Sequence, residues 1–481
     1  MTAAATTTMP QRRRLPFTTK LFYGFGSIAY GIKENGFSTL LLLFYNQVVG
    51  LPADMVGLAL MIALILDAFV DPVVGHLSDG TRTRWGRRHP FMYAAALPIG
   101  VLYLLLWHPP TGAPETTFIY LIITAIVVRS AISFYEVPSS ALAPELTSDY
   151  HERTAVLGYR YMFGWLGGMV MLLATFAIFL APTAQYPIGQ LNPDGYKTYA
   201  LYAAVFMTAA ILISALGTHR EIAHLPKPPP AAPMTLGQTL KGIAETLKNR
   251  AFLTLLLTGV FTYTNQGLAF ALATYFNTFL WEFPASTLGL LTVAVMIGVA
   301  LAFIGATRAS RVLGKRAAAV SFTLAYVAAA ITPYLLRYAG WFPSNDDPAL
   351  VPILFVTTVV SHAFGVGGMI LGASMMSDVV EDSQARTGKR TEGLFFAGAF
   401  FMQKCVTGFG LFFAGAILAW VAFPAQATPG AVAEGVLDRL ILTYCCLKVV
   451  IGVIGATILA QFPISQADHE ARVARLSELS S

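Results

Sequence analysis

The chain has 481 residues, of which 56% are apolar and only 12% are charged. A water-soluble fold of this composition would have too little polar surface to cover its core, so the composition excludes an ordinary soluble protein and indicates lipid as the solvent. The net charge of +6 does not indicate a nucleic-acid partner, because the basic residues fall in alternate short loops, as the positive-inside rule requires.

Stretches long enough to cross a membrane fill nearly the whole chain, since a spanning helix needs about 20 mostly apolar residues. The predicted spans are 21–46, 54–77, 91–108, 117–144, 155–181, 198–216, 250–281, 286–306, 317–337, 350–377, 393–422 and 437–462. We therefore expect an all-α membrane protein with twelve transmembrane helices. Arginines at 12–14 precede an apolar stretch too long for a cleavable signal, and the basic loops place both termini in the cytoplasm of a multi-pass inner-membrane protein.

The longest polar segment, 217–249, divides the chain into an N-terminal six-helix bundle at 1–216 and a C-terminal bundle with a cytoplasmic tail at 250–481. We expect this linker to be cytoplasmic, with an extended Pro-rich start and a surface helix near 234–249. Basic residues flank a glycine both after the second span and after the eighth, at 84–88 and 311–316. Such a repeat between halves is typical of secondary transporters.

Two aspartates, Asp67 and Asp71, lie four residues apart in the second span and therefore share one helix face. Their mutual repulsion is relieved by a bound cation or by a proton. Pro72 cannot donate to the carbonyl of Ala68, which leaves one more oxygen near the pair. Oxygen atoms are the ligands of hard cations, so Asp67 and Asp71 are the candidate metal-ion ligands, and the ion is sodium or a proton.

The fourth span offers Glu136 and, one turn earlier, Ser133, which we expect to complete an oxygen cage around the cation. The alternative is that the three acids only form ion pairs that hold helices together. Lys404, inside the eleventh span, is the natural counter-charge and would couple cation binding to the second half. Its alternative role is to reach the membrane interface.

Other polar residues inside predicted spans are candidate contacts for a polar solute, since burying them without partners is costly. Lys33 and Glu34 are adjacent on one helix and should not face each other, so each requires its own partner. Lys448 is either the partner of Glu34 or a further solute contact. The candidate solute-binding residues are Glu34, Lys33, Arg160, Asn265, Gln266 and Lys448.

Charged loops at equivalent places in the two halves are candidate gates. Residues 75–90 combine Asp79 with Arg84, Arg87 and Arg88, and we expect Asp79 to pair with arginines and latch the cytoplasmic side. Residues 377–392 occupy the matching place in the second half. There we expect Asp378, Glu381 and Asp382 to face basic partners.

Motifs of other function classes are absent from the sequence. GxxxxGK[ST], HExxH and GxSxG do not occur, which argues against an ATP-driven pump and against a hydrolase. A channel or a non-transporting sensor remains the rival to a carrier, because buried acids also line pores. We expect a monomer with no cofactor besides the coupling ion, and the three cysteines suit packing rather than disulfides.

Several blocks of sequence resemble the glycoside–pentoside–hexuronide:cation symporter family, which has the major facilitator fold with two six-helix halves. They are TKLFYGFG at 19–26, DAFVDPVVGHLSDGTRTRWGRRHPF at 67–91, VPSSALAPEL at 137–146, HERT at 151–154 and DVVEDSQARTGKRTEGLFFA at 378–397. The resemblance implies that Asp67 and Asp71 match the family's cation-binding aspartates and that Glu136 matches its span-four acid. It likewise implies that Lys404 and Arg160 match its span-eleven lysine and span-five arginine.

The sequence departs from the melibiose-permease branch of that family at two solute positions. Ser140 stands where that branch has a sugar-stacking tryptophan, and its span-one acid falls near Gly31. Galactoside specificity is therefore not implied. We expect cation-coupled symport of a glycoside or other sugar-like solute by alternating access, with a lysolipid or another amphiphile as the alternative.

Overall fold

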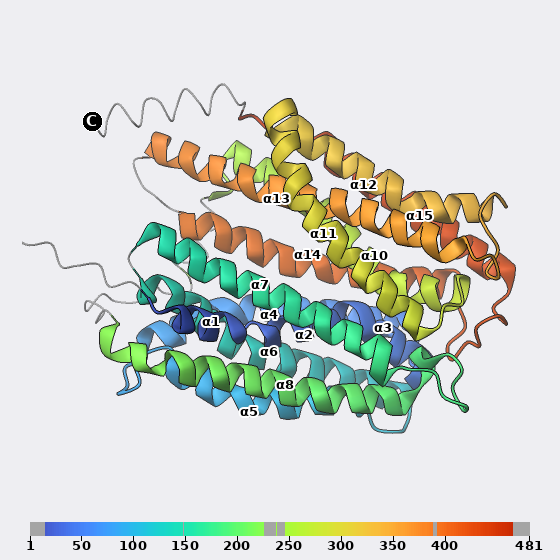
Figure 1. The fold of residues 1–481 in the computed structure, drawn as a ribbon, viewed down its shortest axis with the longest axis horizontal. Helices are drawn as coiled ribbons and strands as arrows, with labels where there is room; N and C mark the ends of the chain where they lie inside the picture. The colour runs from blue at the N-terminus through green and yellow to red at the C-terminus, as the bar shows by residue number, and fades with distance from the viewer. Residues whose placement is uncertain (1–14, 148, 226–236, 238–245, 388–391, 465–481) are drawn as a thin grey trace, which may run out of the picture.

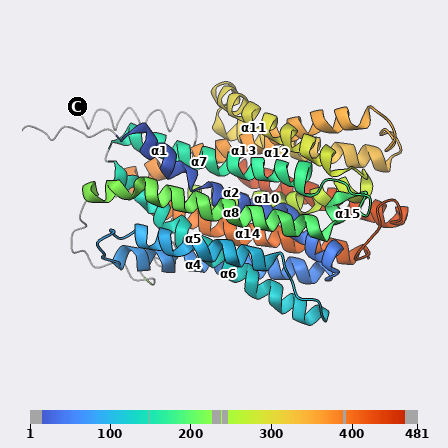
Figure 2. The ribbon, with the colours of Figure 1, turned by 60° about the horizontal axis from the view of Figure 1, so that its bottom comes forward.

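The computed structural model describes residues 15–147, 149–225, 237, 246–387 and 392–464. Long helices run roughly side by side in two bundles, one built from the first half of the chain and one from the second (Figures 1 and 2). Helices α4 and α14, which are more than 300 positions apart in the sequence, pack along each other at the junction of the bundles. Because both helices carry predicted site residues, this junction determines the site.

Ten helices of the described part are long and apolar enough to cross a membrane. They are α4 (Ala53–Gly80), α5 (His89–Leu106), α6 (Pro114–Leu146), α7 (Tyr150–Ala174), α8 (Pro193–His219), α11 (Ala285–Leu313), α12 (Lys315–Tyr338), α13 (Leu350–Thr387), α14 (Glu392–Trp420) and α15 (Glu434–Leu459). Two broken segments occupy the places of the first and seventh spans. The first consists of α1 (Phe17–Phe25), α2 (Ile28–Asn35), η1 (Gly36–Leu40), α3 (Leu41–Leu43) and η2 (Phe44–Val49). The second consists of α10 (Arg250–Tyr275) and η6 (Phe276–Leu280). The twelve-helix prediction is confirmed.

The first span, predicted at 21–46, is present but is not one regular α-helix. It is interrupted between α1 and α2 and again at two π-helical turns, η1 and η2. Glycines allow other helices to come very close here: a Cβ at Gly26 would lie 1.7 Å from the hydroxyl of Tyr135, and one at Gly31 would lie 1.9 Å from the carbonyl oxygen of Gly164. The sequence pattern identified the span but not the tertiary contacts that shape it.

The linker region is only partly described. Helix α8 is followed by the short 3-10 turn η5 (Arg220–His224), and α10 begins at Arg250. The surface helix predicted near 234–249 lies outside the described residues except for 237 and 246–249. One further short turn, η4 (Gly189–Leu191), precedes α8.

The two predicted repeat loops share a backbone feature. Gly86 precedes α5 with φ of +75°, and Gly314 precedes α12 with φ of +76°. Both values lie in the left-handed region that glycine adopts without a steric penalty. The sequence echo between 84–88 and 311–316 thus corresponds to the same chain reversal in the two halves.

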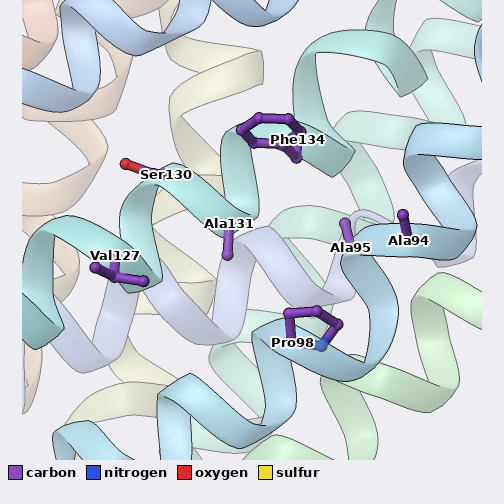
Figure 3. Close-up of a pocket in the computed structure, with 7 residues that line it drawn as sticks. All are labelled: Ala94, Ala95, Pro98, Val127, Ser130, Ala131 and Phe134. Atoms are coloured by element: carbon purple, nitrogen blue, oxygen red, sulfur yellow. The ribbon is translucent and has the colours of Figure 1, made fainter.

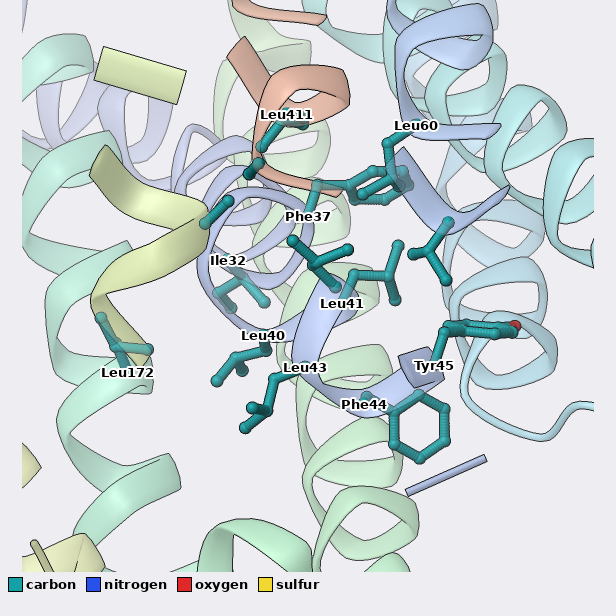
Figure 4. Packing of buried hydrophobic residues seen from close by; sticks show 14 of the residues in the cluster. Ile32, Phe37, Leu40, Leu41, Leu43, Phe44, Tyr45, Leu60, Leu172 and Leu411 are labelled. Carbon is teal, nitrogen blue, oxygen red and sulfur yellow. The ribbon is translucent and has the colours of Figure 1, made fainter. Parts of the chain in front are cut away.

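Neutral hydrogen bonds join the halves at the end opposite the basic loops. The side chain of Gln47 donates to the Pro424 carbonyl at 3.1 Å and accepts from the Ala427 amide at 2.8 Å. The Tyr275 hydroxyl donates to Asn46 at 2.8 Å. Apolar side chains from both halves pack at the same end, where Leu411 of α14 joins the cluster formed by the first span (Figure 4).

Candidate functional site

The centre of the candidate site is an ion-pair cluster between α4 and α14. Lys404 of α14 places its Nζ 2.5 Å from Asp71 Oδ2 and 3.0 Å from Asp67 Oδ2. The expected counter-charge thus crosses from the C-terminal half to both aspartates of the N-terminal half. Its ammonium group lies between the two carboxylates, which is where a bound cation would be attracted.

Ser133 and Arg129 hold the aspartates from α6. The Ser133 hydroxyl lies 2.8 Å from Asp67 Oδ1 and 2.6 Å from Asp71 Oδ1. It has a single proton to donate and also offers lone pairs, so it can serve either carboxylate. Arg129 lies one turn before Ser133, and its guanidinium contacts Asp67 Oδ2 at 3.0 and 3.1 Å.

Arg129 was missed in the sequence analysis. A signal was available, because Arg129 precedes Ser133 by four residues inside a predicted span and so shares its helix face. Arg129 is buried, and its Nη1 has no hydrogen-bond acceptor in the described part. The candidate cation site is therefore a network rather than a pair of acids. Its members are Asp67, Asp71, Ser133, Arg129 and Lys404.

Glu136 is not brought to the aspartates. Its Oε1 accepts a hydrogen bond of 2.5 Å from Arg160 of α7, which also donates to Ser139 at 2.9 Å. No group of three or more potential metal ligands occurs in the described part, so the expected cage of three acids is absent there. The attraction of the buried Arg160 guanidinium explains this placement. Glu136 Oε2 has no hydrogen-bond donor within the described ranges.

Lys33 and Glu34 do pair with each other, contrary to the expectation from helix geometry. Lys33 Nζ lies 2.7 Å from Glu34 Oε2. The long lysine chain bends back over its neighbour, and its ammonium lies 4.4 Å from the centre of the Tyr30 ring.

Lys448 has neutral partners rather than Glu34. Its Nζ donates to Asn265 at 2.9 Å and to the Tyr326 hydroxyl at 3.1 Å, and the side chain is fully buried inside the C-terminal bundle. Gln266, next to Asn265, approaches the sulfur of Met369 at 3.7 Å instead. The structure therefore separates these three residues from the acids of the first half.

The charged residues of the first repeat loop form a network with the end of α6. Arg88 contacts Asp79 at 2.5 Å and Glu145 at 2.9 Å, and Arg87 contacts Glu145 at 2.8 Å. Arg84 instead lies over the ring of Trp85. Asp79 thus has an arginine partner, as expected, and this partner belongs to its own half.

The second half has a corresponding contact. Lys315, after the second repeat loop, lies 2.6 Å from Asp378 of α13. This is the basic partner expected for Asp378. For Glu381 and Asp382 the sequence analysis named no particular basic partner, and within the predicted segment 377–392 residues 388–391 lie outside the described residues.

A third contact at this end ties the start of the chain to α7. Glu152 accepts from Lys20, from Thr147 and from the Leu15 amide, each at 2.9 Å. Burial by itself would raise the pKa of Glu152, but these hydrogen bonds lower the pKa below its ordinary value. The carboxylate is thus stabilised in its charged form beside the first turn of α7.

A groove between α5 and α6 has a volume of about 320 Å³, and its lining differs from that of the charged site (Figure 3). Its lining is apolar except for the hydroxyl of Ser130. Val127 and Phe134, which line it, are exposed on the outer surface of α6, whereas Arg129 and Ser133 of the same helix are buried. The groove is therefore separate from the charged site and suits lipid contact.

Comparison with known proteins places the chain in a family. The family described as MFS/sugar transport protein matches residues 22–466. The chain belongs to this family. The match identifies it as a membrane transport protein of the sugar-transport class rather than an enzyme.

Individual relatives agree with this assignment. A putative glycoside/cation symporter of Escherichia coli is 25% identical over 91% of this chain and 90% of that protein. An isoprimeverose transporter of Lactiplantibacillus pentosus is 25% identical over 85% of this chain and 81% of that protein. An uncharacterized symporter of Synechocystis is 27% identical over 84% and 86%.

Solved structures confirm the fold. A D-xylose-proton symporter superposes with a TM-score of 0.64 at 14% identity, covering 93% of this chain and 98% of that chain. The inward-open xylose transporter XylE from E. coli gives a TM-score of 0.61 at 15% identity, with 95% and 99% covered. The major facilitator fold predicted from the sequence is thus the fold of this chain.

Proposed function

We propose that Asp67 and Asp71 take up one monovalent cation, sodium or a proton, and that this drives uptake of a glycoside-type solute across the cell inner membrane. The observation that carries the proposal is the position of Lys404, whose ammonium lies between the two carboxylates. A cation that enters must displace this ammonium, because both compete for the same oxygens. Binding of the cation is thereby coupled to a side chain of the other half.

Ser133 and Arg129 would have distinct roles in this exchange. Ser133 offers an oxygen to the cation and a hydrogen bond to whichever aspartate remains unpaired. Arg129 keeps Asp67 ionised and in place while Lys404 moves away. Asp71, which has Lys404 as its basic partner, is the carboxylate that changes partner most.

Solute binding would use the remaining acids of the N-terminal half. Glu136 Oε2 is buried without a hydrogen-bond donor among the described residues, and a sugar hydroxyl that reached it as the halves move would supply one. We propose that Arg160 and Lys33, which are buried behind Glu136 and Glu34, position these acids rather than touch the solute. Asn265, Gln266 and Lys448 would border or support the site from the C-terminal half.

Alternating access would use different contacts at the two ends. With the basic loops in the cytoplasm, both termini are cytoplasmic and the neutral bonds of Asn46 and Gln47 close the outer end. Asp79, Arg84, Arg87, Arg88, Asp378 and Glu381 would stabilise the cytoplasmic ends during closure. We propose a monomer as the working unit.

The experiment is counterflow of labelled sugars through the purified protein in lipid vesicles. Uptake of the sugar against its concentration gradient should be driven either by a sodium gradient at constant pH or by a pH jump without sodium. The condition that drives uptake identifies the coupling ion. A channel gives no counterflow, and a sensor gives no flux. Either result would contradict the proposal.

A further inference from the structure

Two amide side chains of the first span connect parts of the C-terminal half at the end opposite the basic loops. Asn46 accepts a hydrogen bond from the Tyr275 hydroxyl of α10 at 2.8 Å, and Gln47 donates to Asn46 at 2.6 Å. Gln47 also reaches the loop between α14 and α15, where it donates to the Pro424 carbonyl and accepts from the Ala427 amide. Because the Gln47 side chain is buried, its amide group needs these partners.

Residues 424–427 form a tight turn, here called the outer turn. In such a turn the carbonyl of the first residue often accepts a hydrogen bond from the amide of the fourth. Here the first carbonyl accepts from Gln47 Nε2 at 3.1 Å, and the fourth amide donates to Gln47 Oε1 at 2.8 Å. The described part contains no hydrogen bond between these two backbone groups themselves. A side chain of the N-terminal half therefore holds a turn of the C-terminal half in place.

The third residue of the outer turn, Gln426, has a backbone φ of +52°. Glycine adopts this left-handed conformation freely, whereas other residues adopt it at a cost in free energy. In sequence, Gln426 lies between the two residues whose backbone groups Gln47 binds. Its side chain packs against Gly50 of the first span, where an added Cβ would lie 3.2 Å from the Gln426 amide group. The strained residue is thus held from the other half of the molecule.

Ala422, just after α14, is also left-handed, with a φ of +54°, but for a different reason. The Phe423 amide donates to the Leu418 carbonyl at 2.8 Å, and this bond lies within the C-terminal half. The conformation of Ala422 therefore does not depend on contact between the halves. At Gln426 the following amide, that of Ala427, is bonded to Gln47 instead.

We propose that Gln47 imposes the strained conformation of the outer turn, and that relaxation of the turn favours opening of the outer end when the halves separate. In the closed state Gln47 binds both backbone groups and Gln426 is left-handed. In the open state water replaces Gln47 at these groups, and Gln426 returns to an unstrained conformation. The strain brings the closed and open states closer in free energy, which a carrier that alternates between them requires. The inference rests on the proposed function, because it specifies how the same carrier opens.

The test measures opening by access to a buried cysteine. Thr274 of α10 is 2% exposed and donates to the Thr39 carbonyl of the first span at 3.0 Å, so it lies between the halves. Thr274→Cys, with the three native cysteines replaced by alanine, is labelled in intact cells with a maleimide that does not cross the membrane. The labelling rate reports the population whose outer end is open. Thr111→Cys, exposed in the loop between α5 and α6, corrects for reagent reactivity.

Removal of the Gln47 amide should open the outer end. Gln47→Leu loses both bonds to the outer turn, and we expect labelling to become faster by on the order of ten-fold. Gln47→Asn keeps a buried amide whose shorter side chain cannot reach both backbone groups, so it should change the rate in the same direction. A rate that neither substitution increases would overturn the inference.

The strain is tested with alanine and glycine at one position. Gln426→Ala and Gln426→Gly both lose the side-chain contact with Gly50, but only the glycine variant is free of the strain. We expect labelling to be about three-fold slower in the glycine variant than in the alanine variant. Ala422→Gly is the matched control and should leave the rate unchanged, because Ala422 keeps its conformation in both states. Equal rates for the two variants of Gln426, or the same slowing in Ala422→Gly, would refute the role of strain.

The labelling rate depends neither on the solute nor on the coupling ion. Absence of counterflow would therefore contradict the proposed function while the labelling result stands. Intact counterflow together with unchanged labelling in all variants would contradict this inference alone.

Discussion

The interiors of the two halves carry charge in different ways. In the N-terminal half, buried bases face acids on neighbouring helices or neighbouring residues, as in Arg129–Asp67 and Arg160–Glu136. In the C-terminal half, Lys448 is surrounded by neutral partners and Lys404 points into the other half. The difference suggests that the first half holds the ion and solute machinery, while the second half supplies one mobile charge.

Among the variants that test this difference between the halves, substitution of Asp67 should have the largest effect. Asp67→Asn leaves the buried Arg129 without its acid, and removing one partner of a buried pair costs about 3–5 kcal/mol. We expect loss of uphill uptake and a clear decrease in Tm. The matched variant Asp71→Asn should also lose coupling but retain its Tm, because Asp71 is accessible. An equal decrease in Tm in the two variants would contradict this ranking.

Removal of the Lys404 ammonium is expected to uncouple solute transport from the cation gradient. Lys404→Ala deletes the ammonium that competes with the cation, so solute flux should persist downhill while losing its dependence on the cation gradient. Downhill and gradient-driven uptake in vesicles measure the two properties separately. Cation dependence equal to that of the unmodified protein would make Lys404 a structural residue.

Neutralising the solute-facing acid should weaken solute binding while sparing coupling. Glu136→Gln converts a charged hydrogen bond into a neutral one, and the difference between the two is about 1–1.5 kcal/mol. We expect KM to rise on the order of ten-fold at similar cation dependence. Glu115→Gln, at the other end of α6, is the control. An unchanged KM for Glu136→Gln would place the solute elsewhere.

The isolated lysine of the second half should matter little for transport. Lys448→Met keeps the length of the side chain and removes a buried charge that is held only by neutral groups, and this gain offsets the loss of its hydrogen bonds to Asn265 and Tyr326. Transport kinetics and Tm should both remain close to those of the unmodified protein. A large rise in KM would instead make Lys448 a solute contact. Both halves would then take part in solute binding.

The smallest effect is expected from lowering the pH at the Glu152 contact at the start of α7. Because its pKa is lowered in the folded protein, its charge stabilises the fold above the ordinary glutamate value near 4.3. This stabilisation is lost as the pH falls through the lowered pKa. Tm measured between pH 6 and pH 3 should therefore decrease more steeply for the unmodified protein than for Glu152→Gln. Parallel curves would remove Glu152 from the acid response.

The sequence by itself determined the class of protein and the elements. Twelve long apolar stretches can satisfy their backbone groups in lipid only as helices, so their number and approximate bounds follow from composition. The charges inside these stretches are costly to bury. For that reason the sequence alone predicted Asp67, Asp71, Glu136 and Lys404 as candidate site residues before any contact was known.

Only the tertiary structure decided how these charges pair. Helical spacing relates residues of one span, but it cannot say which helix faces which across the bundle. Hence Glu136 was assigned to the aspartates instead of Arg160, and the pairing of Lys33 with Glu34 was excluded. The accessibility of each partner is likewise a property of the packed halves.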